Sequence, residues 1–213
     1  MELRKRAWLS TALFTITFMA LANCATAQTS ALDERMKKVL ADPAATAAAI
    51  TAAKKVTFFC DACHGAEGSS SKVDVPNLAG QNPSYLLIQI DKFARGLRHY
   101  SFMEGLMKLL SESDRINVTI FYSSKQVKPA GTETSRAGQA IYTGRCIMCH
   151  GPQGYGNEAT PRLAGQQIKY LSQSIMRYRD RSGERIYEPM SASTSGLKER
   201  DIVALTTYLS SLH

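Results

Sequence analysis

The sequence predicts an all-α protein built from two similar domains in tandem. Three observations lead to this prediction. Short sequence blocks occur twice at a nearly constant offset, which is typical of two copies of one structural unit. Apolar residues within each copy recur at intervals of three and four, the spacing of one helical face. A stretch without helical periodicity separates the copies and fits a linker.

The first 27 residues have the pattern of a signal peptide. Three basic residues near the N-terminus precede an apolar run at residues 7–22, and Ala25-Thr26-Ala27 offers the small residues that a signal peptidase accepts. The run is shorter than the roughly 20 apolar residues of a membrane-spanning helix. We therefore expect residues 1–27 to direct export to the periplasm and to be removed. A segment that is retained as a membrane anchor is the alternative.

Removal of this segment changes both the cysteine count and the charge. Cys24 is lost, so five cysteines become four, an even number that leaves no spare thiol in an exported chain. Three basic residues and one acidic residue are also lost, which lowers the formal net charge from +8 to +6. The remaining basic residues are scattered and form no continuous stripe, so we expect no binding to nucleic acid.

The first predicted domain covers residues 28–122. It begins with an Ala-rich helical extension, residues 31–55, which should be broken near Pro43 and which the second copy lacks. Ser111 and Asp114 have the spacing of a capping box and mark the start of a closing helix. Between these segments, one helical face is predicted for Tyr85, Leu86, Gln89, Ile90 and Phe93.

Residues 123–136 form the predicted linker, because they contain Pro129, Gly131 and several Ser and Thr. The second predicted domain covers residues 137–213. Lys198 stands where the first copy has its capping serine, so the closing helix here needs another partner for its first N–H groups. The equivalent helical face comprises Tyr170, Leu171, Ser174, Ile175 and Tyr178, and the closing helix carries Ile202, Val203, Leu205, Thr206 and Leu209.

A Cys-x-x-Cys-His motif occurs in each copy, at residues 60–64 and 86 positions later at residues 146–150. This motif is typical of c-type haem attachment, in which two thiols form thioethers with the haem vinyl groups and the histidine binds the iron. We therefore expect two covalently bound haem c groups. The predicted attachment residues are Cys60, Cys63, Cys146 and Cys149, and the predicted proximal iron ligands are His64 and His150.

Other uses of paired cysteines explain the pattern less well. A disulfide or a thioredoxin-like redox pair would not require a histidine after both motifs, and a thioredoxin-like pair is normally preceded by a strand. A zinc site could use both pairs. Its ligands would then come from two separate repeats, 86 residues apart.

Methionine is the expected iron ligand on the opposite face, because thioether ligation supports a high reduction potential. Met103 and Met190 occupy equivalent places, 39 and 40 residues after the histidine of their motif, and each precedes a leucine by seven residues and an aspartate by eleven. In the first copy, Met107 lies one helical turn further on and remains an alternative. His99 is a second alternative, which would give a bis-histidine site of lower potential.

A second repeated block, Pro-x-Leu-Ala-Gly-Gln, begins at Pro76 and Pro161. We expect it to run along the haem edge beside the proximal histidine. The carbonyl groups of the two prolines are candidate acceptors for the second imidazole nitrogen, a contact that orients a ligating histidine. A proline that only shapes a turn is the alternative.

The order of these blocks resembles that of the cytochrome c4 family, the dihaem cytochromes of bacterial periplasms. The resemblance rests on the doubled Cys-x-x-Cys-His-Gly and Pro-x-Leu-Ala-Gly-Gln blocks, on Tyr-Leu and Gly-x-Arg pairs after each, and on the following methionine and closing helix. It implies two class I cytochrome c domains related by a pseudo-twofold axis, with His and Met on both irons. It also implies redox partners such as a terminal oxidase, a cytochrome complex or a dehydrogenase, and is compatible with a peripheral position at the inner membrane.

These expectations favour an electron carrier over an enzyme. If both irons carry His and Met, neither has an open coordination position for oxygen, peroxide or a small substrate. An electron-accepting subunit of a periplasmic dehydrogenase complex is an alternative. A dihaem peroxidase is another, although the chain is short for that class.

Overall fold

The computed structural model describes residues 29–183 and 187–213, and all regular secondary structure in these residues is helical. The prediction of an all-α fold is confirmed. The predicted signal peptide, residues 1–27, lies outside the described residues. Among the helices that are described, none combines the length and apolarity needed to cross a membrane.

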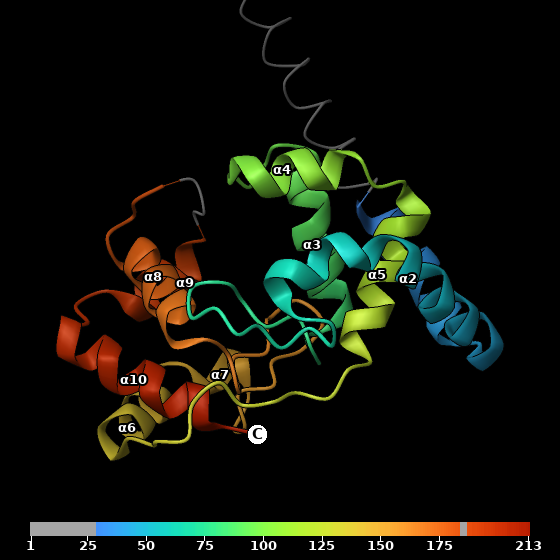
Figure 1. Ribbon diagram of the computed structural model, residues 1–213. Coiled ribbons are helices and arrows are strands. Elements are labelled where there is room, and N and C mark those ends of the chain that lie inside the picture. The colour runs from blue at the N-terminus through green and yellow to red at the C-terminus, as the bar shows by residue number, and fades with distance from the viewer. Residues whose placement is uncertain (1–28, 184–186) are drawn as a thin grey trace, which may run out of the picture.

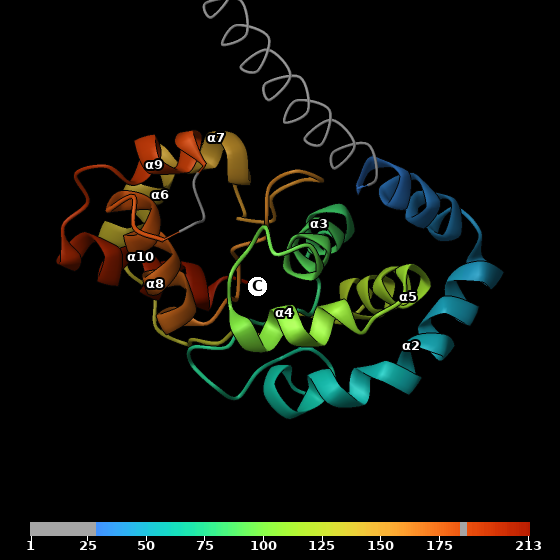
Figure 2. The same cartoon turned by 90° about the horizontal axis from the view of Figure 1, so that it is seen from above.

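The helices form two groups, one from each half of the chain (Figures 1 and 2). Residues 124–135 connect the last helix of the first group with the first helix of the second. The first group comprises α2 (Pro43–His64), α3 (Pro83–Ala94), α4 (Ser101–Lys108) and α5 (Glu112–Ser123). The second comprises α6 (Arg136–Arg145), α7 (Ile147–His150), α8 (Ile168–Arg179), α9 (Glu188–Thr194) and α10 (Glu199–Ser211).

The two groups repeat one order of elements. In each, a helix ends on the histidine of the motif, a helix with a buried apolar face follows, then a short helix, and then a closing helix. The residue after the histidine is a glycine in both, with φ of 78° at Gly65 and 76° at Gly151. Residues other than glycine rarely adopt this conformation. The positive φ therefore explains why a glycine follows the histidine in both copies.

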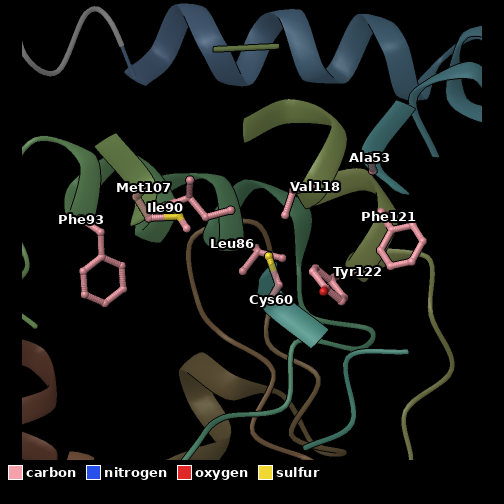
Figure 3. Packing of buried hydrophobic residues seen from close by; sticks show 9 residues of the cluster. All are labelled: Ala53, Cys60, Leu86, Ile90, Phe93, Met107, Val118, Phe121 and Tyr122. Atoms are coloured by element: carbon pink, nitrogen blue, oxygen red, sulfur yellow. The ribbon is translucent and has the colours of Figure 1, made fainter. Parts of the chain in front are cut away.

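Each group has its own apolar core. Helices α2, α3 and α5 contribute to the first, and Figure 3 shows Cys60 beside Leu86 and Tyr122 within it. Helices α6, α8 and α10 contribute to the second. The first cluster consists of Ala53, Cys60, Leu86, Ile90, Phe93, Met107, Val118, Phe121 and Tyr122, and the second of Tyr142, Leu171, Ile175, Leu197, Ile202, Leu205, Tyr208 and Leu209.

The N-terminal extension is broken where the sequence predicts it. Residues 29–40 are helical, and α2 begins after Asp42, whose carboxylate accepts hydrogen bonds from the backbone N–H groups of Ala44 and Ala45 at 2.8 and 3.2 Å. Pro43 occupies the first position of α2, where a missing N–H costs nothing. Leu32 and Met36 of the extension are buried in a third apolar cluster, together with Ala49, Leu87, Ile116 and Ile120.

A buried carboxylate joins the extension to the first core. The Asp91 side chain on α3 is 2% exposed and lies 3.3 Å from both Arg95 and Arg115. Thr29 donates a hydrogen bond to the same carboxylate at 2.6 Å. The charge of Arg115 near the start of α5 is thus explained by an internal ion pair, because a carboxylate that is removed from water needs charged and hydrogen-bonding partners.

The closing helices begin with different caps. In α5, Asp114 N–H donates to Ser111 Oγ at 3.1 Å and Ser111 N–H donates to the Asp114 carboxylate at 3.3 Å, so the predicted capping box is present. In α10, Lys198 N–H donates to the Asp201 carboxylate at 2.9 Å. Half of the box is therefore kept where lysine has replaced serine, since lysine has no side-chain acceptor.

Gly138 permits the close approach of α6 and α10. A Cβ atom at this position would overlap the carbonyl oxygen of Ala204 on α10. We expect Gly138→Ala to lower the free energy of unfolding of the second domain by about 1 to 3 kcal/mol, because the clash involves backbone that cannot rotate away. Denaturant titration of the purified protein measures this change.

Gly144 on the same helix is the matched control. A Cβ atom there would meet nothing within 4 Å. Gly144→Ala should leave the stability unchanged or raise it by up to about 1 kcal/mol, since alanine favours the helix. If both substitutions had the same effect, the close helix crossing would not be what requires glycine at position 138.

Candidate haem-binding sites

The first motif lies at the end of a buried stripe on α2. Ala49, Ala53, Thr57, Cys60 and His64 are the buried residues of this helix and recur at intervals of three and four. The face that packs against α5 therefore also carries Cys60 and His64 into the interior. Cys63, on the neighbouring face, is partly exposed. Burial raises the pKa of the Cys60 thiol to about 11, so this group is protonated at neutral pH.

In the first domain, the proximal histidine is oriented by a backbone carbonyl. His64 Nδ1 lies 2.8 Å from the carbonyl oxygen of Pro76. A carbonyl oxygen only accepts, so Nδ1 must carry the proton of this hydrogen bond. Burial lowers the pKa of His64 and favours the neutral ring. The Nε2 lone pair is then free to bind a metal ion.

The second domain repeats this arrangement. His150 Nδ1 lies 3.0 Å from the carbonyl oxygen of Pro161, and burial again lowers the pKa of the histidine. The expectation that both proline carbonyls accept from the motif histidines is confirmed. A proline that only shapes a turn would not explain two equivalent contacts.

The second motif differs from the first in its helical setting. α6 ends at Arg145, Cys146 lies between helices, and the short α7 holds the rest of the motif. Cys146 is partly buried and Cys149 is exposed. Burial raises the pKa of the Cys146 thiol to about 11, as it does for its counterpart.

The two predicted methionines occupy equivalent positions in the backbone. Met103 is the third residue of α4 and Met190 is the third residue of α9. Both helices follow a tyrosine in extended conformation, with φ and ψ of −164° and 103° at Tyr100 and −149° and 102° at Tyr187. Both methionines are half-buried. The correspondence that the sequence spacing indicates thus extends to the local fold.

The alternatives in the first domain have other environments. Met107 is 3% exposed and belongs to the apolar core. His99 is half-exposed, and its Nδ1 lies 3.3 Å from the Glu104 carboxylate. The contact with Glu104 accounts for the position of His99, whereas Met107 lies in the same apolar core against which Met103 packs.

The residues present fit a covalently bound haem better than the rival cofactors. Each half supplies two thiols, one neutral imidazole and one thioether, which are the donors that haem c uses. In the structure, no disulfide joins Cys60, Cys63, Cys146 or Cys149. Within the described ranges, no three His, Cys, Asp or Glu side chains gather as they would around zinc.

The repeated Pro-x-Leu-Ala-Gly-Gln blocks also meet at the domain interface, a role that the sequence does not reveal. Gln81 Nε2 donates to the carbonyl oxygen of Arg162 at 3.0 Å, and Gln166 Nε2 donates to the carbonyl oxygen of Asn77 at 3.0 Å. Asn77, Gln81 and Gln166 are buried. The glutamine that ends both blocks was the available signal, because a long polar side chain at the same repeated position suggests a shared contact.

An all-helical fold with a Cys-x-x-Cys-His motif in each half is that of a c-type cytochrome, and the cytochrome c family model matches residues 135–213. The chain is 32% identical over 168 residues to cytochrome c4 of Pseudomonas aeruginosa, an alignment that covers 72% of this chain and 84% of that protein. The chain therefore belongs to the cytochrome c4 family, whose members carry electrons on two haems.

A solved structure supports the same assignment. The crystal structure of reduced recombinant cytochrome c4 from Pseudomonas stutzeri matches with a TM-score of 0.71 and 27% identity, covering 76% of this chain and 98% of that one. The two-domain fold is thus confirmed. A thiosulfate dehydrogenase electron acceptor from Stutzerimonas stutzeri is also similar, at 26% identity over 178 residues, with 75% of this chain and 82% of that protein covered.

Proposed function

We propose that this protein is a periplasmic electron carrier whose two domains, residues 28–122 and 137–213, are joined by the linker at residues 123–136. Cys60 and Cys63 attach one haem, and Cys146 and Cys149 attach the other. The proposed axial ligands are His64 with Met103 and His150 with Met190. The observation that carries this proposal is the equivalent histidine–proline contact in both domains, at 2.8 and 3.0 Å.

The residues of the chain hold each redox centre in one geometry. The proline carbonyls keep the Nδ1 proton of each histidine in place, which aims Nε2 at a single point and raises its basicity. Met103 and Met190, the third residues of α4 and α9, would supply the second protein ligand of each iron. When bound, haem iron supplies a one-electron couple. If His and Met bind both irons as proposed, no position is left for a substrate, and the proposed activity is electron transfer alone.

Two kinds of redox partner are proposed for this protein. The family resemblance favours a terminal oxidase, and the similar electron acceptor of thiosulfate dehydrogenase favours a dehydrogenase. Gel filtration of native extracts separates a free carrier from a permanent subunit of a dehydrogenase. A free carrier elutes at the size of the single chain, whereas a dehydrogenase subunit elutes with its partner.

Peroxide turnover tests the proposal that the protein is not an enzyme. We expect the holoprotein to reduce peroxide no faster than a cytochrome c with the same His and Met ligands, because the proposed ligand sets leave neither iron an open position. Turnover well above that control, accompanied by loss of one methionine ligand on reduction, would reverse the assignment in favour of a peroxidase.

A further inference from the structure

One peptide unit in the first domain connects its proximal histidine to the second domain. The carbonyl group of Pro76 accepts the hydrogen bond from His64 Nδ1 at 2.8 Å. The N–H group of the same peptide belongs to Asn77 and donates to Gln166 Oε1 at 2.6 Å. The histidine of one domain and the glutamine of the other therefore bind opposite ends of a single amide.

The second domain contains the same arrangement with the roles of the two domains exchanged. The carbonyl group of Pro161 accepts from His150 Nδ1 at 3.0 Å, and the N–H group of Arg162 donates to Gln81 Oε1 at 2.7 Å. Such reciprocal contacts are expected of a twofold-related interface. The two amides, and not only the two folds, are thus related by the pseudo-symmetry.

Both glutamines are held rigidly. Each also donates through Nε2 to the carbonyl oxygen of the residue whose N–H group it accepts from, at 3.0 Å in both domains. Gln81 is 7% exposed and Gln166 is 6% exposed. Hydrogen bonds in such shielded surroundings polarise one another more than they do in water, so a change at one end of the amide is felt at the other.

We propose that Gln166 and Gln81 are positioning residues that tune the reduction potential of the haem in the opposite domain, a proposal that rests on the ligand sets given under Proposed function. Acceptance of the Asn77 N–H bond by Gln166 makes the Pro76 carbonyl oxygen more negative. That oxygen then pulls harder on the Nδ1 proton of His64 and makes the imidazole a stronger donor, which stabilises the oxidised iron. Loss of the glutamine should raise the potential.

The test uses Gln166→Met and Gln81→Met in the full-length holoprotein. The potential of each haem is followed by its own paramagnetically shifted NMR signals during a redox titration. Gln166→Met should raise the potential of the haem held by His64, and Gln81→Met that of the haem held by His150. A change of about twofold in the electron-exchange equilibrium is expected, given the modest cooperativity of linked hydrogen bonds. In each variant the other haem should keep its potential.

Gln167→Met is the matched control. Gln167 is also buried and also crosses the interface, donating to the Ser70 carbonyl oxygen at 2.7 Å and to Asn77 Oδ1 at 3.1 Å, but it does not bind the Pro76–Asn77 amide. A loosened interface would affect this variant as much as the others. If a methionine variant loses a haem, Gln166→Asn and Gln81→Asn replace it in the experiment. The asparagine side chain is one methylene shorter and should not reach the amide of the opposite domain.

The proposal requires that each substitution shift the potential of the haem in the opposite domain and leave the haem of its own domain unchanged. Equal shifts of both haems, a shift only within the substituted domain, or shifts matched by Gln167→Met would each overturn the proposal. The haem content and the sulfur-to-iron absorption band of the same samples are measured in parallel. Two Met-ligated haems without crossed shifts would reject this inference alone, whereas missing haems in the unaltered protein would reject the proposed function.

Discussion

Met190→Ala is expected to abolish the sulfur-to-iron absorption band of one haem and to lower the potential of that haem on the order of 0.1 V. Thioether ligation stabilises reduced iron, and alanine offers no donor in its place. Met190 is the third residue of α9, the place that Met103 holds in α4. Met103→Ala should therefore do the same to the other haem. Absorption spectra combined with a spectroelectrochemical titration measure both effects.

Two conservative substitutions provide the controls. Met107→Leu removes the competing sulfur of the first domain but keeps its buried volume. Met176→Leu does the same for a partly buried methionine packed on the second core. Both proteins should retain two sulfur-to-iron bands. A normal spectrum for Met190→Ala would show that Met190 is not an iron ligand. Loss of a band in Met107→Leu would show that Met107, and not Met103, is the distal ligand in the first domain.

The second large effect is expected from the double substitution Cys60→Ala/Cys63→Ala. The exported protein should carry one haem instead of two, since no thiol remains to form a thioether in the first domain. A cofactor that binds only the folded state stabilises it, and a small domain has a limited core. The free energy of unfolding of the first domain should thus fall by on the order of a few kcal/mol.

Mass spectrometry and thermal unfolding check this expectation together. The equivalent variant in the second motif, Cys146→Ala/Cys149→Ala, should lose the other haem and destabilise the second domain. Each variant should keep the transition of its intact domain. Retention of both haems by either double variant would show that the motif cysteines are not the attachment points.

The helical repeat could be predicted because it is a local property of the chain. The break before Pro43 and the capping box at Ser111 depend on residues within one turn of each other, and both are present as predicted. The contacts of His64 and His150 with the prolines were also predictable, since the repeat places the prolines at nearly the same distance, 12 and 11 residues after the motif histidine. For these two contacts, the equivalence of the copies supported the prediction.

Contacts between distant polar residues could not be predicted. Asp91, Arg95 and Arg115 have the polarity of surface residues, but Asp91 pairs with both arginines, and Thr29 of the N-terminal extension contacts Asp91 and Arg95. The glutamines of the repeated block look like partners of the cofactor edge, whereas they bind backbone of the opposite domain. Helical periodicity reports which face of an element is buried but not which polar groups meet across an interface.

Mass spectrometry of the exported protein, made in a host competent in cytochrome maturation, tests most directly whether each half binds its own haem. The mass should exceed that of the bare polypeptide by two haem equivalents, and proteolytic peptides containing residues 60–64 and 146–150 should each carry one. A mass excess of any other size, or unmodified cysteines in either peptide, would contradict the account of both sites.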